Sequence, residues 1–142
     1  MGVTNSVLKP FTVKNRNGEE FFVTCNRNIF DWELTVRTSA KEDAGFLRFA
    51  PQEKAPNTVK IYDFQINPKF WGKGIGTDLL NTLFVSFKEE GFNYIVGICK
   101  SSNRDLSEKE DLARWYEKLG FVLVRETSEE VPGYLGELSK EL

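Results

Sequence analysis

The chain has 142 residues, enough for one hydrophobic core, and we expect residues 1–142 to form a single domain. Its 19 basic and 21 acidic residues give a net charge of −2, which argues against broad electrostatic binding to nucleic acid. The absence of histidine excludes Ser-His-Asp and Cys-His catalysis, and no metal site is expected.

Two features predict where the protein works. No apolar run reaches membrane-spanning length and no signal peptide is visible, so we expect no membrane association. Cys25 and Cys99 lie in apolar, strand-like runs without the close spacing of a disulfide framework, which predicts two buried thiols in a reducing compartment. The predicted location is therefore cytoplasmic.

The first half of the chain reads as β-structure. We expect an antiparallel meander of five strands, at residues 11–14, 20–26, 32–37, 45–50 and 58–66. Asn17-Gly18 suits the positive φ angles of a tight hairpin turn between the first two strands. Residues 51–57, which contain two prolines, are predicted to form a loop, and Asn67-Pro68 closes the fifth strand.

A glycine-rich turn then leads into a helix. Three glycines in five positions, Gly72, Gly74 and Gly76, precede apolar residues at helical spacing, with Gly91 as the expected C-cap. Such a turn exposes unpaired backbone N–H groups at the positive end of a helix dipole, where phosphate binds well. Neither a nucleotide P-loop nor a dinucleotide fingerprint is complete, so the glycines alone also fit a plain tight turn.

The residue pattern in the last third of the chain predicts a strand, a second helix and two closing strands. Residues 93–98 are mostly apolar, as in a strand covered on both faces. Ser107 and Glu110 form a capping box that should open a helix ended by Gly120. Leu112, Trp115, Tyr116 and Leu119 would share one face of that helix. The closing strands are predicted at residues 121–124 and 134–138, around Pro132-Gly133.

The order of these elements resembles the GNAT superfamily of N-acetyltransferases, over about residues 59 to 121. Ile66-Asn67-Pro68 and the run from Trp71 to Gly76 match the strand end and the R/Q-x-x-G-x-G/A signature of that family. The run from Tyr116 to Phe121 matches its later Tyr-x-Lys-x-Gly-Phe pattern. The resemblance implies an α+β fold with a mixed, mostly antiparallel sheet, and acetyl-CoA as cosubstrate without a metal.

The resemblance also implies the residues that hold acetyl-CoA. Backbone groups of the glycine turn would cradle the pyrophosphate, and the end of the preceding strand would contact the pantetheine arm. Lys73 would add positive charge, unless it is only a solvated turn lysine. The expected cofactor-binding residues are Gln65, Ile66, Trp71, Gly72, Lys73, Gly74, Ile75, Gly76, Thr77 and Asn103.

Three departures from the family pattern concern the site. Trp71 stands where Arg or Gln is usual. The run Trp71-Gly72-Lys73-Gly74 resembles the variant found in acetyltransferases that modify ribosomal-protein N-termini. Lys60 stands at the place of the family's usual glutamate base. The two early helices that normally wall the acceptor site are not evident before Asn57, so the acceptor side is expected to be open or completed by another chain. A homodimer is one of the open alternatives.

The expected activity is acetyl transfer from acetyl-CoA to an amine by direct attack in a ternary complex. Tyr116 is the proposed general acid, against the plainer reading of a core tyrosine. Asp63, Tyr62, Glu33 and a water chain are the candidate bases. The acceptor is an amine of a small molecule or a protein, and the sequence does not choose between them. The alternative function is a non-catalytic acyl-CoA-binding, sensing or protein-interaction module on the same fold.

Overall fold

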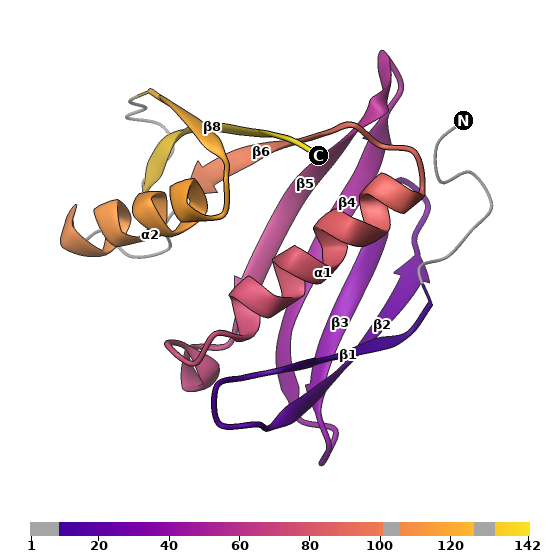
Figure 1. Ribbon diagram of the computed structural model, residues 1–142, viewed down its shortest axis with the longest axis vertical. Coiled ribbons are helices and arrows are strands. Elements are labelled where there is room, and N and C mark those ends of the chain that lie inside the picture. Colours follow the sequence, from indigo (N-terminus) through magenta and orange to yellow (C-terminus); the bar gives the residue numbers. More distant parts are fainter. Residues whose placement is uncertain (1–8, 101–105, 127–132) are drawn as a thin grey trace.

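The structure, a computed structural model, describes residues 9–100, 106–126 and 133–142. These residues form one eight-stranded sheet and two α-helices, in an α+β architecture (Figure 1). The strands lie in the order β1-β2-β3-β4-β5-β6-β8-β7. The elements are β1 (Phe11–Lys14), β2 (Glu20–Arg27), β3 (Trp32–Thr38), β4 (Asp43–Gln52), β5 (Ala55–Ile66), a 3-10 helix η1 (Pro68–Phe70), α1 (Ile75–Glu89), β6 (Tyr94–Lys100), α2 (Leu106–Lys118), β7 (Val122–Arg125) and β8 (Tyr134–Glu141).

Strands β1 to β5 form the predicted antiparallel meander. Gly18 takes a φ of 80° in the β1–β2 turn, which a residue with a side chain rarely adopts. The alternation in β3 holds as well, because Trp32, Leu34 and Val36 are buried. Between residues 9 and 67 the structure contains no helix, so the prediction that the usual two early helices are missing is confirmed.

The loop predicted at residues 51–57 is wrong. Strand β4 continues to Gln52 and β5 starts at Ala55, so that only a tight turn separates them. The register of the pair shifts between Pro51 and Gln52. A bulge of this kind lets a proline stay in a strand although it cannot donate a hydrogen bond to the ladder.

Strands β5 and β6 are parallel and pair over a short stretch only. Their partners run from Thr58 opposite Tyr94 to Lys60 opposite Val96. Beyond Lys60, β5 stays paired with β4 and β6 with β8, and no further β5–β6 pair is formed. The two strands therefore diverge toward the end of β5, which is the end that leads into the glycine turn.

Both helices pack on the same face of the sheet (Figure 1). One core joins the inner side of α1, including Leu79, Leu83 and Phe87, to buried residues of the strands. Strand β6 is not covered on both faces, contrary to the prediction, because Tyr94 and Ile98 are 44% and 42% exposed. Its apolar character thus extends onto a face that no described helix covers.

Two smaller expectations need correction. Helix α2 begins at Leu106, so Ser107 lies within the helix and not at the predicted N-cap position. The residue that precedes Leu106, like Asn103 and Pro132, lies outside the described residues. Cys99 is buried as predicted, whereas Cys25 is only partly buried.

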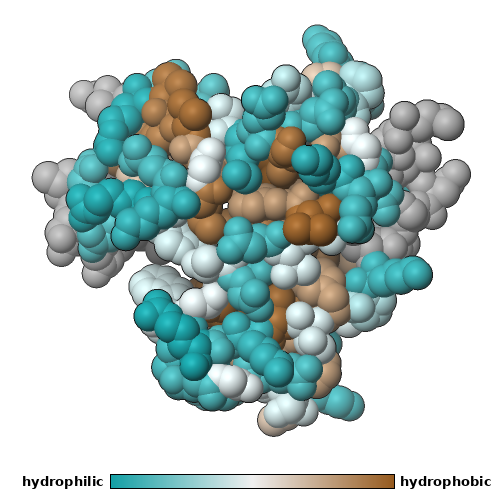
Figure 2. All heavy atoms as spheres, in the orientation of Figure 1, coloured by the Kyte–Doolittle hydropathy of each residue, from teal (hydrophilic) through white to brown (hydrophobic). Residues whose placement is uncertain are grey.

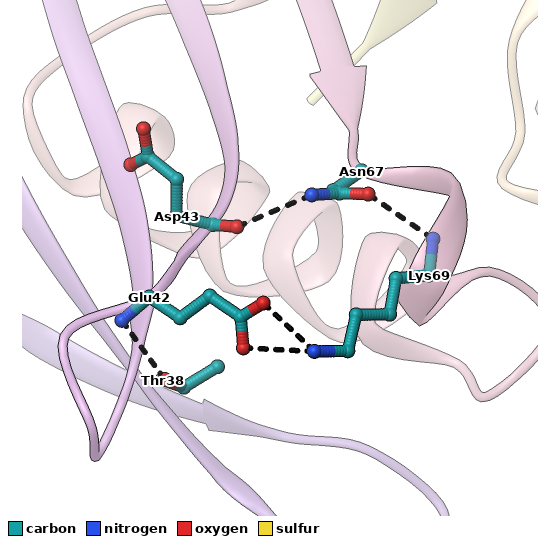
Figure 3. Close-up of polar contacts among 5 residues, drawn as sticks. All are labelled: Thr38, Glu42, Asp43, Asn67 and Lys69. Atoms are coloured by element: carbon teal, nitrogen blue, oxygen red, sulfur yellow. Dashed lines mark hydrogen bonds and ion pairs between the residues drawn. The ribbon is translucent and has the colours of Figure 1, made fainter.

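Polar contacts fix the chain between β5 and the glycine turn (Figure 3). The Asn67 side chain accepts a hydrogen bond from the Lys69 N–H at 3.1 Å and donates one to the Asp43 carbonyl at 3.4 Å. The Lys69 ammonium pairs with the Glu42 carboxylate at 2.8 Å. The β3–β4 hairpin thus holds η1, and with it the start of the glycine turn, in place.

We expect Gly136→Ala to destabilise the protein strongly. Gly136 has a φ of 145°, and a Cβ there would overlap the Val124 carbonyl of the neighbouring strand. The expected loss is about 3–5 kcal/mol of unfolding free energy, from backbone strain and overpacking. Gly18→Ala is the control, since its φ is also positive but nothing lies within 4 Å. It should cost about 1 kcal/mol. Urea unfolding of both variants measures the difference, and equal losses would contradict the steric explanation.

Candidate functional site

The glycine turn requires left-handed backbone at two positions. Gly72 and Gly74 have φ angles of 78° and 86°, and Gly74 is the N-cap of α1. Gly74 makes no side-chain cap, because it has no side chain to offer. The turn therefore brings bare backbone to the start of the helix.

Six successive backbone N–H groups are open in this turn. Among the described residues, none of the N–H groups of residues 72–77 has a hydrogen-bond acceptor. Uncapped N–H groups at a helix start carry partial positive charge and favour an anion. A shallow, open pocket borders them, lined by Thr12, Lys14, Asn15, Arg16, Lys73, Gly74, Thr77, Asp78 and Asn81.

A second element, the β1–β2 hairpin, forms the other side of this pocket. The Arg16 N–H donates to the Lys73 carbonyl at 2.7 Å, and the Lys14 N–H donates to the Asp78 carboxylate at 2.9 Å. The Arg16 side chain lies beside Gly74. Sequence reasoning missed Arg16 and Lys14. In the sequence, Arg16 and Lys14 are marked only by their position next to the predicted hairpin turn. That position does not show which part of the fold the hairpin packs against.

The strand end before the turn is arranged around Trp71. Its indole Nε1 donates to the Ile66 carbonyl at 2.6 Å. The Gln65 carbonyl points toward Gly45 of β4, and the Asn67 N–H donates to the Ala44 carbonyl of the same strand. Backbone groups alternate along a strand, so Ile66 directs its own away from β4. Of the two residues proposed for the cofactor arm, Ile66 is the one whose backbone faces the open side.

Trp115 of α2 fills the space between the two helices and β5. Its indole Nε1 donates to the Thr77 hydroxyl at 2.9 Å, and its ring stacks on Phe64 with centroids 6.3 Å apart. A Cβ on Gly76 would come within 3.2 Å of that ring. Gly76 is thus needed for helix packing, while Gly72 and Gly74 are needed for the turn. The Thr77 side chain is engaged with α2, which leaves its N–H for a ligand.

Tyr116 lies on the inner side of α2 and is partly buried. Its ring packs against the rings of Trp115 and Phe121 in T-shaped contacts, with ring centroids 4.9 Å and 5.6 Å apart, respectively. Burial, with a smaller effect from Cys99, raises the pKa of Tyr116 above its usual range. Burial also raises the pKa of Cys99 to about 11, so this thiol is protonated near neutral pH and suits a core position better than nucleophilic catalysis.

The three candidate bases share the helix-free face of the sheet. The Arg48 guanidinium lies 3.6 Å from the Glu33 carboxylate, and Arg48 is the cross-strand partner of Asp63. Nearby, the Lys60 ammonium lies over the Tyr62 ring, 5.1 Å from its centroid. The structure thus brings Glu33 and Asp63 together around Arg48, a residue that sequence reasoning did not single out.

The face that carries the helices has a different character. Hydrophilic residues predominate there, and hydrophobic ones are visible in the hollow between α1 and the part of the chain that carries α2 (Figure 2). Within the described ranges, no group of three or more Asp, Glu or Cys residues is arranged to hold a metal. In the same ranges, no helix is long and apolar enough to cross a membrane.

The comparisons with known proteins that give a match agree on one family. Residues 5–121 match the model of the GNAT acetyltransferase family. The GNAT domain of PAT from S. lividans has a similar fold, with a TM-score of 0.70 and 12% identity over 94% of this chain and 97% of its own. A GNAT acetyltransferase from Elizabethkingia anophelis was solved with acetyl-CoA bound. It has a TM-score of 0.58 and 17% identity over 79% of this chain and 76% of its own. The search of curated protein sequences gives no match.

Proposed function

The chain belongs to the GNAT family of acetyltransferases, which are enzymes, and we propose that it transfers an acetyl group from acetyl-CoA to an amine by direct attack within a ternary complex. The observation that supports this most is the glycine turn. It offers six open N–H groups beside Lys14, Arg16 and Lys73, at the end where β5 and β6 diverge. This donor set fits a pyrophosphate.

The residues of the turn would hold the cosubstrate, which supplies an activated acetyl group as a thioester. The N–H groups of residues 72–77 and the nearby cations would bind its phosphates. The diverging strands leave room for an extended arm beside Ile66. Trp71 positions this strand end, because its indole already satisfies the Ile66 carbonyl.

Acid and base would come from opposite faces of the sheet. Tyr116, kept protonated by burial, would give its proton to the thiolate that leaves when the amine attacks. The amine would approach from the helix-free face, where Glu33, Asp63 and Tyr62 lie. One of these groups, or a water they hold, would accept the proton that the amine loses. The absence of early helices in residues 9–67 leaves that approach open.

One observation favours a non-catalytic acyl-CoA-binding module instead. Lys60 occupies the place of the family's usual glutamate base, and its ammonium lies over the Tyr62 ring. A cation there would repel a protonated amine. The two functions share the glycine-turn site and differ only in turnover.

Release of free CoA thiol tests the proposal. The protein is incubated with acetyl-CoA and a panel of amines that includes polyamines, free lysine and peptides with free N-termini. Acceptor-dependent thiol release, with an acetylated product of the expected mass, would support the enzyme. Tight binding of acetyl-CoA without release for any amine would favour the binding module. Absence of acetyl-CoA binding would contradict both.

A further inference from the structure

We propose that Arg16, at the tip of the β1–β2 hairpin, binds the pyrophosphate of acetyl-CoA from the side opposite the glycine turn. This inference rests on the proposed function and adds a binding residue that comes from a separate part of the chain. The hairpin and the start of α1 lie side by side at the lower end of the molecule (Figure 1).

The hairpin tip is held in one conformation by its own contacts. Asn15 is only 7% exposed, and its side-chain oxygen accepts hydrogen bonds from the N–H groups of Asn17 and Glu19, both at 3.0 Å. Its amide also donates to the Glu19 carboxylate at 3.1 Å. A tip fixed in this way limits the loss of backbone entropy on binding, so that the ordering cost falls mainly on the Arg16 side chain.

The hairpin is also fixed relative to the glycine turn. The hydrogen bond from the Arg16 N–H to the Lys73 carbonyl ties the two loops together directly. The second bond, from the Lys14 N–H to Asp78, attaches the end of β1 to the first turn of α1. The backbone of Arg16 is therefore held beside the glycine turn, within reach of its side chain.

The Arg16 side chain has the position and the chemistry for a phosphate. Its Nε would lie 3.4 Å from a Cβ on Gly74, so it passes beside the open N–H groups. In the described part of the chain, no ion pair engages Arg16, Lys14 or Lys73. A guanidinium can bind two phosphate oxygens at once, which an ammonium cannot do in the same planar geometry.

The test is the affinity of Arg16→Gln for acetyl-CoA, measured by calorimetry. We expect binding about tenfold weaker than for the wild-type chain, with a smaller difference at high salt. Arg16→Lys should recover part of the loss. Arg27→Gln is the matched control, because it removes the same charge from an exposed residue at the far end of β2. Its affinity should stay within about twofold of the wild type.

The outcomes separate this inference from the proposed function. Unchanged affinity of Arg16→Gln, or an equal loss in Arg27→Gln, would overturn the role of Arg16 and leave acetyl-CoA binding intact. Arg16→Gln should weaken the binding of acetyl-CoA that lacks the 3′-phosphate as much as the binding of acetyl-CoA itself. If the substitution weakened only the binding of complete acetyl-CoA, Arg16 would bind the 3′-phosphate and the pyrophosphate assignment would be wrong. Failure of the wild-type chain to bind acetyl-CoA would contradict the proposed function as well.

Discussion

Tyr116→Phe should slow acetyl transfer by about 10²- to 10⁴-fold while leaving the affinity for acetyl-CoA nearly unchanged. The substitution keeps the ring, and with it the T-shaped contacts to Trp115 and Phe121. Only the hydroxyl is lost, so the expected effect falls on proton transfer. Burial raises the pKa of Tyr116 above its ordinary value of 10.0. At pH values up to about 10, ionisation of Tyr116 should therefore not reduce the rate.

Tyr94→Phe is the matched control for this variant. Tyr94 lies on the helix-free face at the paired end of β6, 44% exposed, and removing its hydroxyl should not change the rate. Affinity, melting temperature and turnover are measured on both variants. A Tyr116→Phe protein with full turnover and a lowered melting temperature would show that Tyr116 is a core residue without a catalytic role.

Gly74→Val should abolish the stabilisation that acetyl-CoA gives the wild-type protein. At a free concentration of 100 times Kd, binding adds about 2.7 kcal/mol and should raise Tm by about 5–10 °C, whereas ATP should give no comparable shift. The branched side chain would crowd the Arg16 side chain and the space beside the open N–H groups. It would also strain a backbone with a φ of 86°.

Because strain alone lowers Tm, the readout is the shift caused by acetyl-CoA and not Tm itself. Gly91→Val introduces a similar strain, at a φ of 100°, just beyond the other end of α1. That variant should unfold at a lower temperature and still respond fully to acetyl-CoA. An unchanged response in Gly74→Val would remove the glycine turn from consideration as the cofactor site.

Local patterns predicted the elements of this fold well. Asn17-Gly18, the alternation in β3 and the helical spacing after Gly74 each act over a few residues, and each appears in the structure. Where prediction failed, distant contacts decided the outcome. Pro51 stays in a strand because a register shift against β5 accommodates it, and β6 is apolar on a face that no described helix covers.

The candidate site shows the same division. The glycine turn and the position of Tyr116 could be predicted, because each lies within a continuous motif. Arg16 could not, because it reaches the turn only after the β1–β2 hairpin packs on α1 through contacts across more than fifty residues. The grouping of Glu33 and Asp63 around Arg48 likewise depends on the pairing of three strands. Neither the contact of Arg16 with the glycine turn nor the grouping around Arg48 can be predicted from the spacing of residues along the sequence.

A crystal structure of the protein with acetyl-CoA tests the central claim most directly. We predict that the pyrophosphate lies against the N–H groups of residues 72–77, with the acyl end between the diverging β5 and β6 and within reach of the Tyr116 hydroxyl. Density for the cosubstrate at any other place, with the glycine turn left unoccupied at saturating concentration, would contradict the account.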